Sequence, residues 1–298
     1  MGKEKLCVSF SGGRTSAFMA RWCQQNLADQ YDIKYVFANT GLEDQRTLDF
    51  VQRCDQEWEL GVVWLEAVVH YNKKLGSTHK VVSYDSASVD GTPFEEVIRK
   101  YGIPNKAYPH CTRELKLNPI RSYMKEVGWW GNCDMAVGIR ADEIDRMQAS
   151  APKKRIIYPL IRHHPMDKES INRWWEAQPF KLELEELNGN CVTCWKKSER
   201  KLLTIAKSSP ELFEWNQRME DQYGLSGHNV DGTPRVFFRS NTSTKDLIAK
   251  SKENFNPWTA NQQISLFTEE DMPNGCSESC EVEFIVDRDW ETDRKSVV

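Results

Sequence analysis

The sequence predicts an α/β fold: a doubly wound, Rossmann-like α/β/α sandwich around a parallel sheet, with a helical, cysteine-bearing C-terminal part. Short apolar runs alternate with amphipathic helical patterns, which is the arrangement of a parallel sheet covered on both faces. The first apolar run ends in a glycine-rich turn, residues 11–16, that opens a helical pattern. The chain has 298 residues, of which 39% are hydrophobic, enough for a substantial core.

The expected elements follow from the periods of the apolar residues. Strands are expected at residues 6–10, 33–38, 61–66 and 133–137, and helices at residues 16–27, 45–57, 93–101 and 114–126. Beyond Tyr158 the pattern turns helical, with helices expected at residues 168–178 and 198–208. Because the carboxyl ends of parallel strands meet at one edge of a sheet, the loops after the first, second and fourth strands should converge on one crevice.

One domain is expected over residues 1–225, with its core sheet in residues 5–160 and its helical part, which carries a Cys-x-x-Cys pair, in residues 161–225. From about residue 226 the chain is turn-rich and polar, with only short apolar pieces. We therefore expect residues 226–298 to be a partly disordered extension and not a second compact domain. The charged, patternless end of this stretch is assigned no function.

Composition limits the classes of protein to which the chain can belong. The net charge of −4 gives no overall attraction to nucleic acid. No apolar stretch approaches the roughly 18 residues of a membrane span, and no signal peptide is visible, so we expect a cytoplasmic protein without membrane contact. Nine cysteines, an odd number, indicate thiols with a metal or redox site more than a disulfide framework.

The glycine-rich turn has the sequence Ser11-Gly12-Gly13-Arg14-Thr15-Ser16. Adjacent glycines let the backbone turn with positive φ and bring its amides close to a ligand. These amides, with the positive end of the following helix, suit a phosphate or sulfate, and the three hydroxyls add donors. The alternative is an ordinary turn with Thr15 or Ser16 as helix N-cap. A Walker-type phosphate loop is excluded because its Gly-x-x-x-x-Gly-Lys-Ser/Thr spacing is absent.

Further motifs follow the turn in a fixed order. They are Phe-Ala-Asn-Thr-Gly-Leu-Glu at 37–43, Cys-Thr-Arg-Glu-Leu-Lys-Leu-Asn-Pro-Ile at 111–120, Val-Gly-Ile-Arg-Ala-Asp-Glu at 137–143, Tyr-Pro-Leu at 158–160 and Cys-Val-Thr-Cys at 191–194. With Phe10-Ser11-Gly12-Gly13-x-Thr15-Ser16 they resemble the PP-loop proteins of the adenine nucleotide α-hydrolase superfamily, in the branch of phosphoadenylylsulfate (PAPS) and adenylylsulfate reductases. The resemblance covers roughly residues 5–205.

The resemblance implies an adenylyl nucleotide as ligand: ATP, adenylylsulfate or PAPS. The residues expected to bind it are Ser9, Ser11, Gly12, Gly13, Arg14, Thr15 and Ser16 at the phosphate or sulfate, Asn39, Thr40 and Gly41 at the nucleoside, and Gly138 with Arg140 at the anion. Arg140 could instead form an ion pair, although its place just past a strand favours an anion clamp. Asp142 and Glu143 could bind Mg²⁺, and capping of the next helix is slightly favoured.

The cysteines suggest a second centre. Cys191-x-x-Cys194 has metal-ligand spacing, and the reductase family's iron–sulfur branch adds a Cys-Cys pair roughly eighty residues earlier to hold a [4Fe–4S] cluster. Here Cys111 occupies that region between His110 and Thr112, so one expected thiolate is missing. Cys111, Cys191 and Cys194 are the expected ligands of a cluster or zinc, and His110, Cys133, Cys276 or Cys280 could supply the fourth.

Three functions remain open. In a PAPS reductase-like oxidoreductase, Cys276 or Cys280 would attack the sulfate sulfur and a thiol electron donor would complete the reduction, although the family's Glu-Cys-Gly motif is absent after Cys194. In an ATP pyrophosphatase-type sulfurtransferase, ATP would adenylate a small molecule or a nucleic acid, as in DNA phosphorothioation. The PP-loop carries Thr15 where many relatives carry aspartate, so it lacks a carboxylate that could help hold a metal ion at the phosphates. The third possibility is a nucleotide-binding module without turnover.

Overall fold

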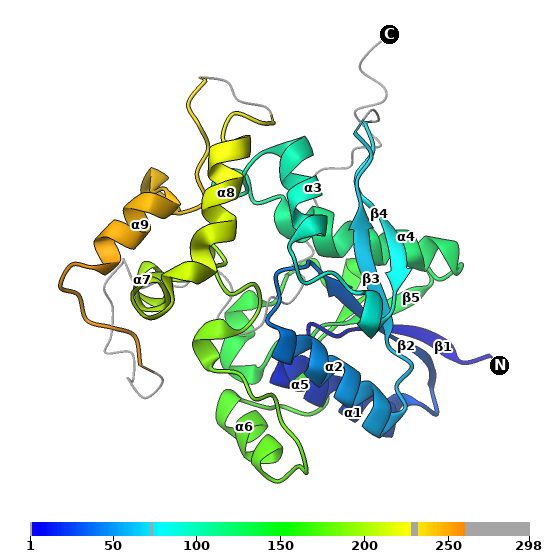
Figure 1. Cartoon of the computed structure of the whole chain (residues 1–298). Coiled ribbons are helices and arrows are strands. Elements are labelled where there is room, and N and C mark those ends of the chain that lie inside the picture. The colour runs from blue at the N-terminus through cyan, green and yellow to red at the C-terminus, as the bar shows by residue number, and fades with distance from the viewer. Residues whose placement is uncertain (1, 72–73, 228–231, 260–298) are drawn as a thin grey trace.

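The fold is built on a six-stranded, mostly parallel sheet. In this computed structural model, residues 2–71, 74–227 and 232–259 are described. The strands are β1 (Glu4–Ser9), β2 (Tyr31–Asn39), β3 (Val63–Val68), β4 (Thr78–Val82), β5 (Cys133–Ala136) and β6 (Ile156–Ile157). Their order across the sheet is β4-β3-β2-β1-β5-β6, and only the β3–β4 pair is antiparallel (Figure 1). The predicted α/β class is confirmed, with one antiparallel edge strand that was not predicted.

Helices cover both faces of the sheet. The α-helices are α1 (Arg14–Leu27), α2 (Gln45–Trp58), α3 (Thr92–Tyr101), α4 (Asn118–Glu126), α5 (Pro159–Arg162), α6 (Lys168–Glu176), α7 (Glu199–Ser208), α8 (Glu214–Tyr223) and α9 (Thr244–Ser251). A π-helical turn, Arg113–Leu117, leads directly into α4, so the predicted helix at 114–126 begins with a wider coil. Among the described helices, none is long and apolar enough to cross a membrane.

Alternation along β1 shows how one strand serves two cores. Leu6 and Val8 pack with α1, α2 and α6 on one face, whereas Cys7 packs with α4 and β5 on the other. All three side chains are fully buried. A strand covered on both faces reads as a continuous apolar run, which explains why β1 and β2 could be predicted from sequence. Strand β4 was missed because its segment Thr-His-Lys-Val-Val is partly exposed, and β6 because it has two residues.

The sheet reverses its order at β1, and this places the site. Strands β2 and β3 lie on one side of β1, and β5 and β6 lie on the other. Strands β1 and β5 are neighbours, so the loops that leave them start side by side at the carboxyl edge of the sheet, where the strand order reverses. These two loops hold the glycine turn and Arg140. The strand order thus brings together two of the three loops that were predicted to converge, those after β1 and β5.

A third apolar cluster joins α3, α7, α8 and α9 beside the sheet (Figure 1). Its buried members include Phe237, Phe238 and Leu247, which follow the expected start of the extension. Gly224 and Arg235 are also joined by a backbone hydrogen bond of 2.7 Å. The described part of the extension, residues 232–259, therefore contributes side chains to the same core as α7 and α8, the helices that follow the cysteine pair.

Candidate functional site: an anion pocket beside a thiol cavity

The glycine turn lies between β1 and α1 with an open helix N-terminus. Gly12 has φ +83°, which favours glycine, and Gly13 is the N-cap of α1. No side chain caps α1, and its first turn contains no acidic residue. The first-turn amides have no acceptor within the helix, so they and the helix dipole present positive charge to a ligand. The alternative of a Thr15 or Ser16 cap is wrong.

Ser16 holds the turn together from inside. Its hydroxyl donates to the carbonyl oxygen of Gly13 at 3.0 Å and accepts from the amide and hydroxyl of Ser11 at 3.2 and 2.9 Å. Ser16 is fully buried and Ser9 is buried within β1. Neither lines the pocket described next. Both were expected to bind the anion; the bonds of Ser16 fix the shape of the turn instead, and Ser9 is enclosed by the sheet.

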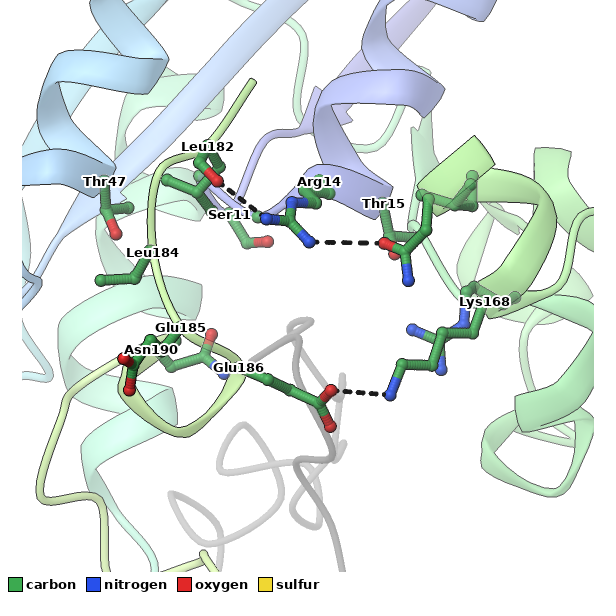
Figure 2. A pocket seen from close by; sticks show the side chains of 16 residues that line it. Ser11, Arg14, Thr15, Thr47, Lys168, Leu182, Leu184, Glu185, Glu186 and Asn190 are labelled. Carbon is green, nitrogen blue, oxygen red and sulfur yellow. Dashed lines mark hydrogen bonds and ion pairs between the residues drawn. The ribbon is translucent and has the colours of Figure 1, made fainter. Parts of the chain in front are cut away.

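The turn and Arg140 line one pocket (Figure 2). The predicted residues on its wall are Ser11, Gly12, Gly13, Arg14, Thr15 and Arg140. The others, which the sequence did not suggest, are Thr47, Lys168, Ile171, Asn172, Leu182, Leu184, Glu185, Glu186, Gly189 and Asn190. We call this the anion pocket.

The wall opposite the turn comes from α6 and the chain that follows it. The Arg14 guanidinium donates to the Leu182 carbonyl oxygen at 2.8 Å, and Trp175 Nε1 donates to the Arg14 carbonyl oxygen at 2.9 Å. Farther along the pocket, Lys168 Nζ lies 2.9 Å from a carboxylate oxygen of Glu186 (Figure 2). No local motif marks these residues. Only the packing of α6 on α1 brings them to the turn.

Arg140 combines the two interpretations offered for it. Its side chain is 5% exposed and lines the anion pocket, yet Nε and Nη2 donate to Asp142 at 3.0 and 3.1 Å. Glu143 lies 3.7 Å from the same guanidinium and accepts from the Arg140 amide. The two carboxylates thus position Arg140 and offset part of its charge. Gly138 is not among the residues that line the pocket.

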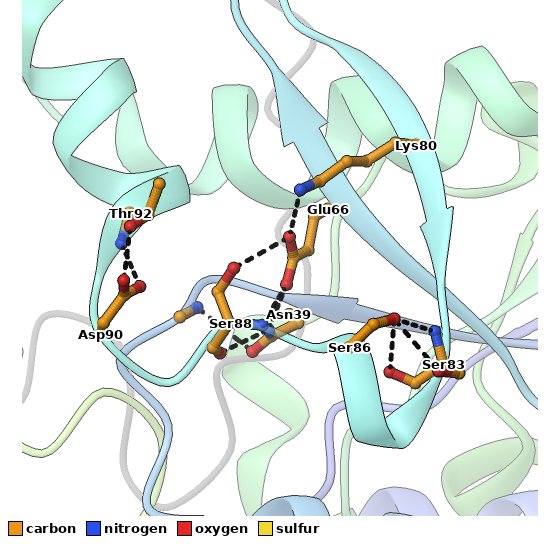
Figure 3. A network of polar contacts seen from close by, with 9 residues as sticks. Asn39, Glu66, Lys80, Ser83, Ser86, Ser88, Asp90 and Thr92 are labelled. Atoms are coloured by element: carbon orange, nitrogen blue, oxygen red, sulfur yellow. Dashed lines mark hydrogen bonds and ion pairs between the residues drawn. The ribbon is translucent and has the colours of Figure 1, made fainter.

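The loop after β2 does not reach the anion pocket. Asn39 Nδ2 donates to Glu66 and to the Ser88 carbonyl oxygen, both at 2.8 Å, and its Oδ1 accepts from the Gly41 amide at 3.1 Å (Figure 3). Lys80 pairs with the fully buried Glu66 at 2.9 Å. Asn39 and Gly41 were expected at the nucleoside. Their contacts tie β2 to β3 and to the segment before α3, and the role at the nucleoside stays a prediction.

The three predicted cysteine ligands line one cavity. We call it the thiol cavity; its wall includes Cys111, Cys191 and Cys194, with Thr40, Thr112, Lys116, Lys196 and several aromatic side chains. The Thr40 hydroxyl lies 3.4 Å from Cys191 Sγ. The backbones of Glu43 and Cys191 form an isolated antiparallel β-bridge. Thr40 therefore lines this cavity, and the nucleoside role expected for it stays a prediction. The cysteines are half-buried.

The described residues do not complete a metal site. Within residues 2–71, 74–227 and 232–259, no group of three or more His, Cys, Asp and Glu side chains is arranged to hold a metal ion. His110 is not part of the cavity wall; its ring packs 5.6 Å from that of Tyr101, and burial lowers its pKa to about 4. Cys133 begins β5, at the edge of the sheet opposite the site. Cys133 therefore lies away from the thiol cavity, whereas His110 Nε2 is buried without a hydrogen-bond partner among the described residues and its role as fourth ligand stays a prediction.

Cys276 and Cys280, the predicted nucleophiles, lie outside the described residues. The turn Asn188-Gly189-Asn190 was noticed only as a flank of the cysteine pair. In the structure it lines the anion pocket through Gly189 and Asn190, and Cys191, the next residue, lines the thiol cavity. The two cavities therefore adjoin along a single stretch of backbone.

Known proteins resemble this chain at several levels. No family model matches the sequence. The uncharacterized nin region protein ORF290 of Escherichia phage lambda is 33% identical over 283 residues, which span 92% of this chain and 94% of the phage protein. The chain belongs to the family of this phage protein. Because ORF290 is uncharacterized, membership of its family assigns no activity.

Two more distant relatives come from Methanocaldococcus jannaschii. The uncharacterized proteins MJ0973 and MJ0066 are 29% and 27% identical to 83% and 76% of this chain, which spans 53% and 44% of their lengths. A U34-tRNA thiolase, NcsA of Methanococcus maripaludis with its [4Fe-4S] cluster, aligns with 85% of this chain and 72% of its own at 14% identity, with a TM-score of 0.40. That likeness is too low to bear on function.

Proposed function

We propose that this protein is a PP-loop enzyme that binds an adenylyl nucleotide in the anion pocket and performs sulfur chemistry there, next to the thiols of the adjoining cavity. The observation that carries the proposal is the junction at Asn190 and Cys191, which line the two cavities in succession. An anion held by the turn would therefore lie in the cavity next to the one that the thiols line. The order of motifs along the chain agrees with this assignment.

The anion would be held mainly by backbone and cations. The open N-terminus of α1 offers amides, and the Gly12 bend lets a ligand approach the main chain closely. Lys168, 38% exposed in its side chain, can turn from Glu186 to a phosphate oxygen. Arg140 is fixed by Asp142 and adds charge at the far side. These groups stabilise charge on a phosphate or sulfate.

Reduction of adenylylsulfate or PAPS is one candidate reaction. A cysteine thiolate attacks the sulfate sulfur, the sulfur–oxygen bond to the nucleotide breaks, and AMP or its 3′-phosphorylated form leaves. A second thiol then attacks the resulting S-sulfocysteine, so that sulfite is released and a disulfide forms. The resemblance of the motifs to the reductase family supports this candidate. Its nucleophile would come from Cys276 or Cys280.

Adenylation followed by sulfur transfer is the second candidate. A substrate oxygen attacks the α-phosphate of ATP and pyrophosphate leaves; a sulfur nucleophile then attacks the carbon or phosphorus that bears this oxygen, and AMP leaves. Glu185 and Glu186 favour this reaction, because they place carboxylates on the wall of the anion pocket. Carboxylates repel a sulfate but can help hold the Mg²⁺ that accompanies a triphosphate. A nucleic-acid acceptor belongs to this candidate only.

The metal is a separate part of the proposal. Cys111, Cys191 and Cys194 would contribute three ligands to zinc or to a [4Fe–4S] cluster, but the described residues supply no complete set, so no reaction step is assigned to it. Metal analysis of anaerobically purified protein tests this part. Iron or zinc that is lost in a Cys191→Ser, Cys194→Ser double variant supports the site, and the absence of both metals removes it.

One set of assays tests the function. The full chain, prepared anaerobically, is titrated with ATP and Mg²⁺, adenylylsulfate and PAPS in a calorimeter, and products are followed with and without dithiothreitol. Thiol-dependent sulfite indicates reduction, and AMP with pyrophosphate indicates adenylation, with water as a slow surrogate acceptor. Binding without product indicates a nucleotide-binding module. No binding of any of the three nucleotides would overturn the proposal.

A further inference from the structure

Thr47 has a buried hydroxyl on the wall of the anion pocket. It lies in the first turn of α2, is 3% exposed, and its Oγ1 has no hydrogen-bond partner among the described residues. Leaving a buried hydroxyl without a partner costs roughly 1–3 kcal/mol. A valine would fill the same volume without this cost. The position therefore calls for an acceptor that the protein alone does not provide.

Packing against the glycine turn fixes the direction of the side chain. The Thr47 methyl, Cγ2, would lie 2.6 Å from a Cβ built on Gly12, so the two residues are in direct contact. With the methyl held against Gly12, the hydroxyl points toward Leu184, another residue of the pocket wall (Figure 2). β-Branched side chains are restricted at χ1, so the orientation is stable.

We propose that the Thr47 hydroxyl donates a hydrogen bond to an anionic oxygen of the nucleotide, at the phosphate or sulfate group seated in the glycine turn. The inference deepens the proposed function and rests on it. The first-turn amides of α1 and Lys168 are donors or cations and cannot accept the Thr47 proton, and the acceptors on the wall, such as the carboxylates of Glu185 and Glu186, do not bond it. An oxyanion can accept from the amides, Lys168 and Thr47 at once.

Two substitutions separate the hydroxyl from the methyl. Thr47→Val removes the hydroxyl and keeps the shape; Thr47→Ser keeps the hydroxyl and removes the methyl that touches Gly12. We expect Thr47→Val to weaken binding of the tightest of ATP with Mg²⁺, adenylylsulfate and PAPS by about ten-fold or more, the size typical of a hydrogen bond to a charged group. The same variant without ligand should unfold at an equal or higher urea concentration. Thr47→Ser should bind within about three-fold of the parent protein.

A matched control makes the same change elsewhere. Thr244→Val replaces a fully buried threonine at the start of α9, outside the anion pocket, and should leave nucleotide affinity unchanged. If Thr47→Val binds nucleotide as the parent protein does, Thr47 is only a packing residue and the inference is wrong while the proposed function stands. If the parent protein binds none of the three nucleotides, the proposed function itself fails.

Discussion

Asn190 and Cys191 are consecutive residues, yet Asn190 lines the anion pocket and Cys191 lines the thiol cavity. Lys197 fixes the backbone of this stretch through hydrogen bonds. Its side chain is buried, and Nζ donates to the carbonyl oxygens of Leu187 and Val192, one on each side of the junction. One ammonium group therefore positions a piece of backbone that both cavities share. We therefore expect a structural change in one cavity to alter the other.

Lys197→Met tests this coupling. The substitution keeps the aliphatic stem but leaves two carbonyl oxygens without their donor, so we expect a loss of about 2 kcal/mol in the free energy of unfolding, measured with urea. Nucleotide affinity and the alkylation rate of Cys191 should both change. Lys196→Met is the control, because it removes a neighbouring ammonium group that bonds the Thr112 hydroxyl at 3.3 Å. Equal effects of the two variants would contradict the assignment.

Gly12→Ala should destabilise the protein even without ligand. Its φ of +83° is strained for alanine, and the new Cβ would lie 2.6 Å from Thr47 Cγ2 and 3.2 Å from Val51 Cγ2. We expect a loss of at least about 2 kcal/mol in the free energy of unfolding. Gly61→Ala is the control for backbone strain alone, since φ is +67° and nothing lies within 4 Å of its Cβ; about 1 kcal/mol is expected there.

Adding Thr47→Ser to Gly12→Ala separates the two causes further. Serine lacks the methyl that meets the new Cβ, so part of the lost stability should return, while the contact with Val51 remains. No recovery in the double variant would show that steric contact with Thr47 is unimportant at this turn. Nucleotide affinity of Gly12→Ala alone is a poor test of the turn, because the variant also disturbs the packing of α2.

Lys168→Gln should weaken nucleotide binding about five- to ten-fold, since it removes a cation from the wall of the anion pocket. Stability should change little, because the ion pair with Glu186 is partly exposed. Calorimetry at two salt concentrations measures the effect, and the difference should shrink at high salt. Lys245→Gln removes another exposed lysine, paired with Asp221 at 3.2 Å outside the pocket, and should bind normally. A similar loss in both variants would refute a role for Lys168.

The thiols should separate into two classes in native protein at pH 8. Burial raises the pKa of Cys23 to about 12 and holds the pKa values of Cys7 and Cys54 well above their usual range, so these three stay protonated and shielded. The cavity thiols are half-buried: Cys111, Cys191 and Cys194. We expect iodoacetamide to modify them about a hundred-fold faster, measured by peptide mass spectrometry. Comparable rates at Cys7 would contradict the burial pattern.

Much of the sheet and its helices could be predicted because burial on both faces leaves a direct trace in sequence. The apolar runs of β1 and β2 and the amphipathic pattern of α2 identified those elements within a few residues. The glycine turn could also be predicted, since only local geometry decides it. Edge strand β4 escaped because a partly exposed strand needs few apolar residues.

The site was predicted less completely. Ser9 and Ser16 have hydroxyls that could bind an anion, but both side chains are buried in the interior. The side-chain amide of Asn39 donates hydrogen bonds to Glu66 and to the Ser88 carbonyl oxygen. Their direction depends on which way a strand or turn presents each side chain, and a motif does not record that. Thr47 and Lys168 had no motif to mark them.

By itself, then, the sequence determined the α/β class, the glycine turn at the end of β1 and the set of thiols at Cys111, Cys191 and Cys194. These depend on hydrophobic period and local backbone freedom, which neighbouring residues encode. Only the tertiary structure decided that α6 and the chain through Asn190 close the anion pocket. It also decided that Cys191, the next residue, lines the thiol cavity. Such contacts join residues more than a hundred positions apart, and packing of α6 on α1 creates them.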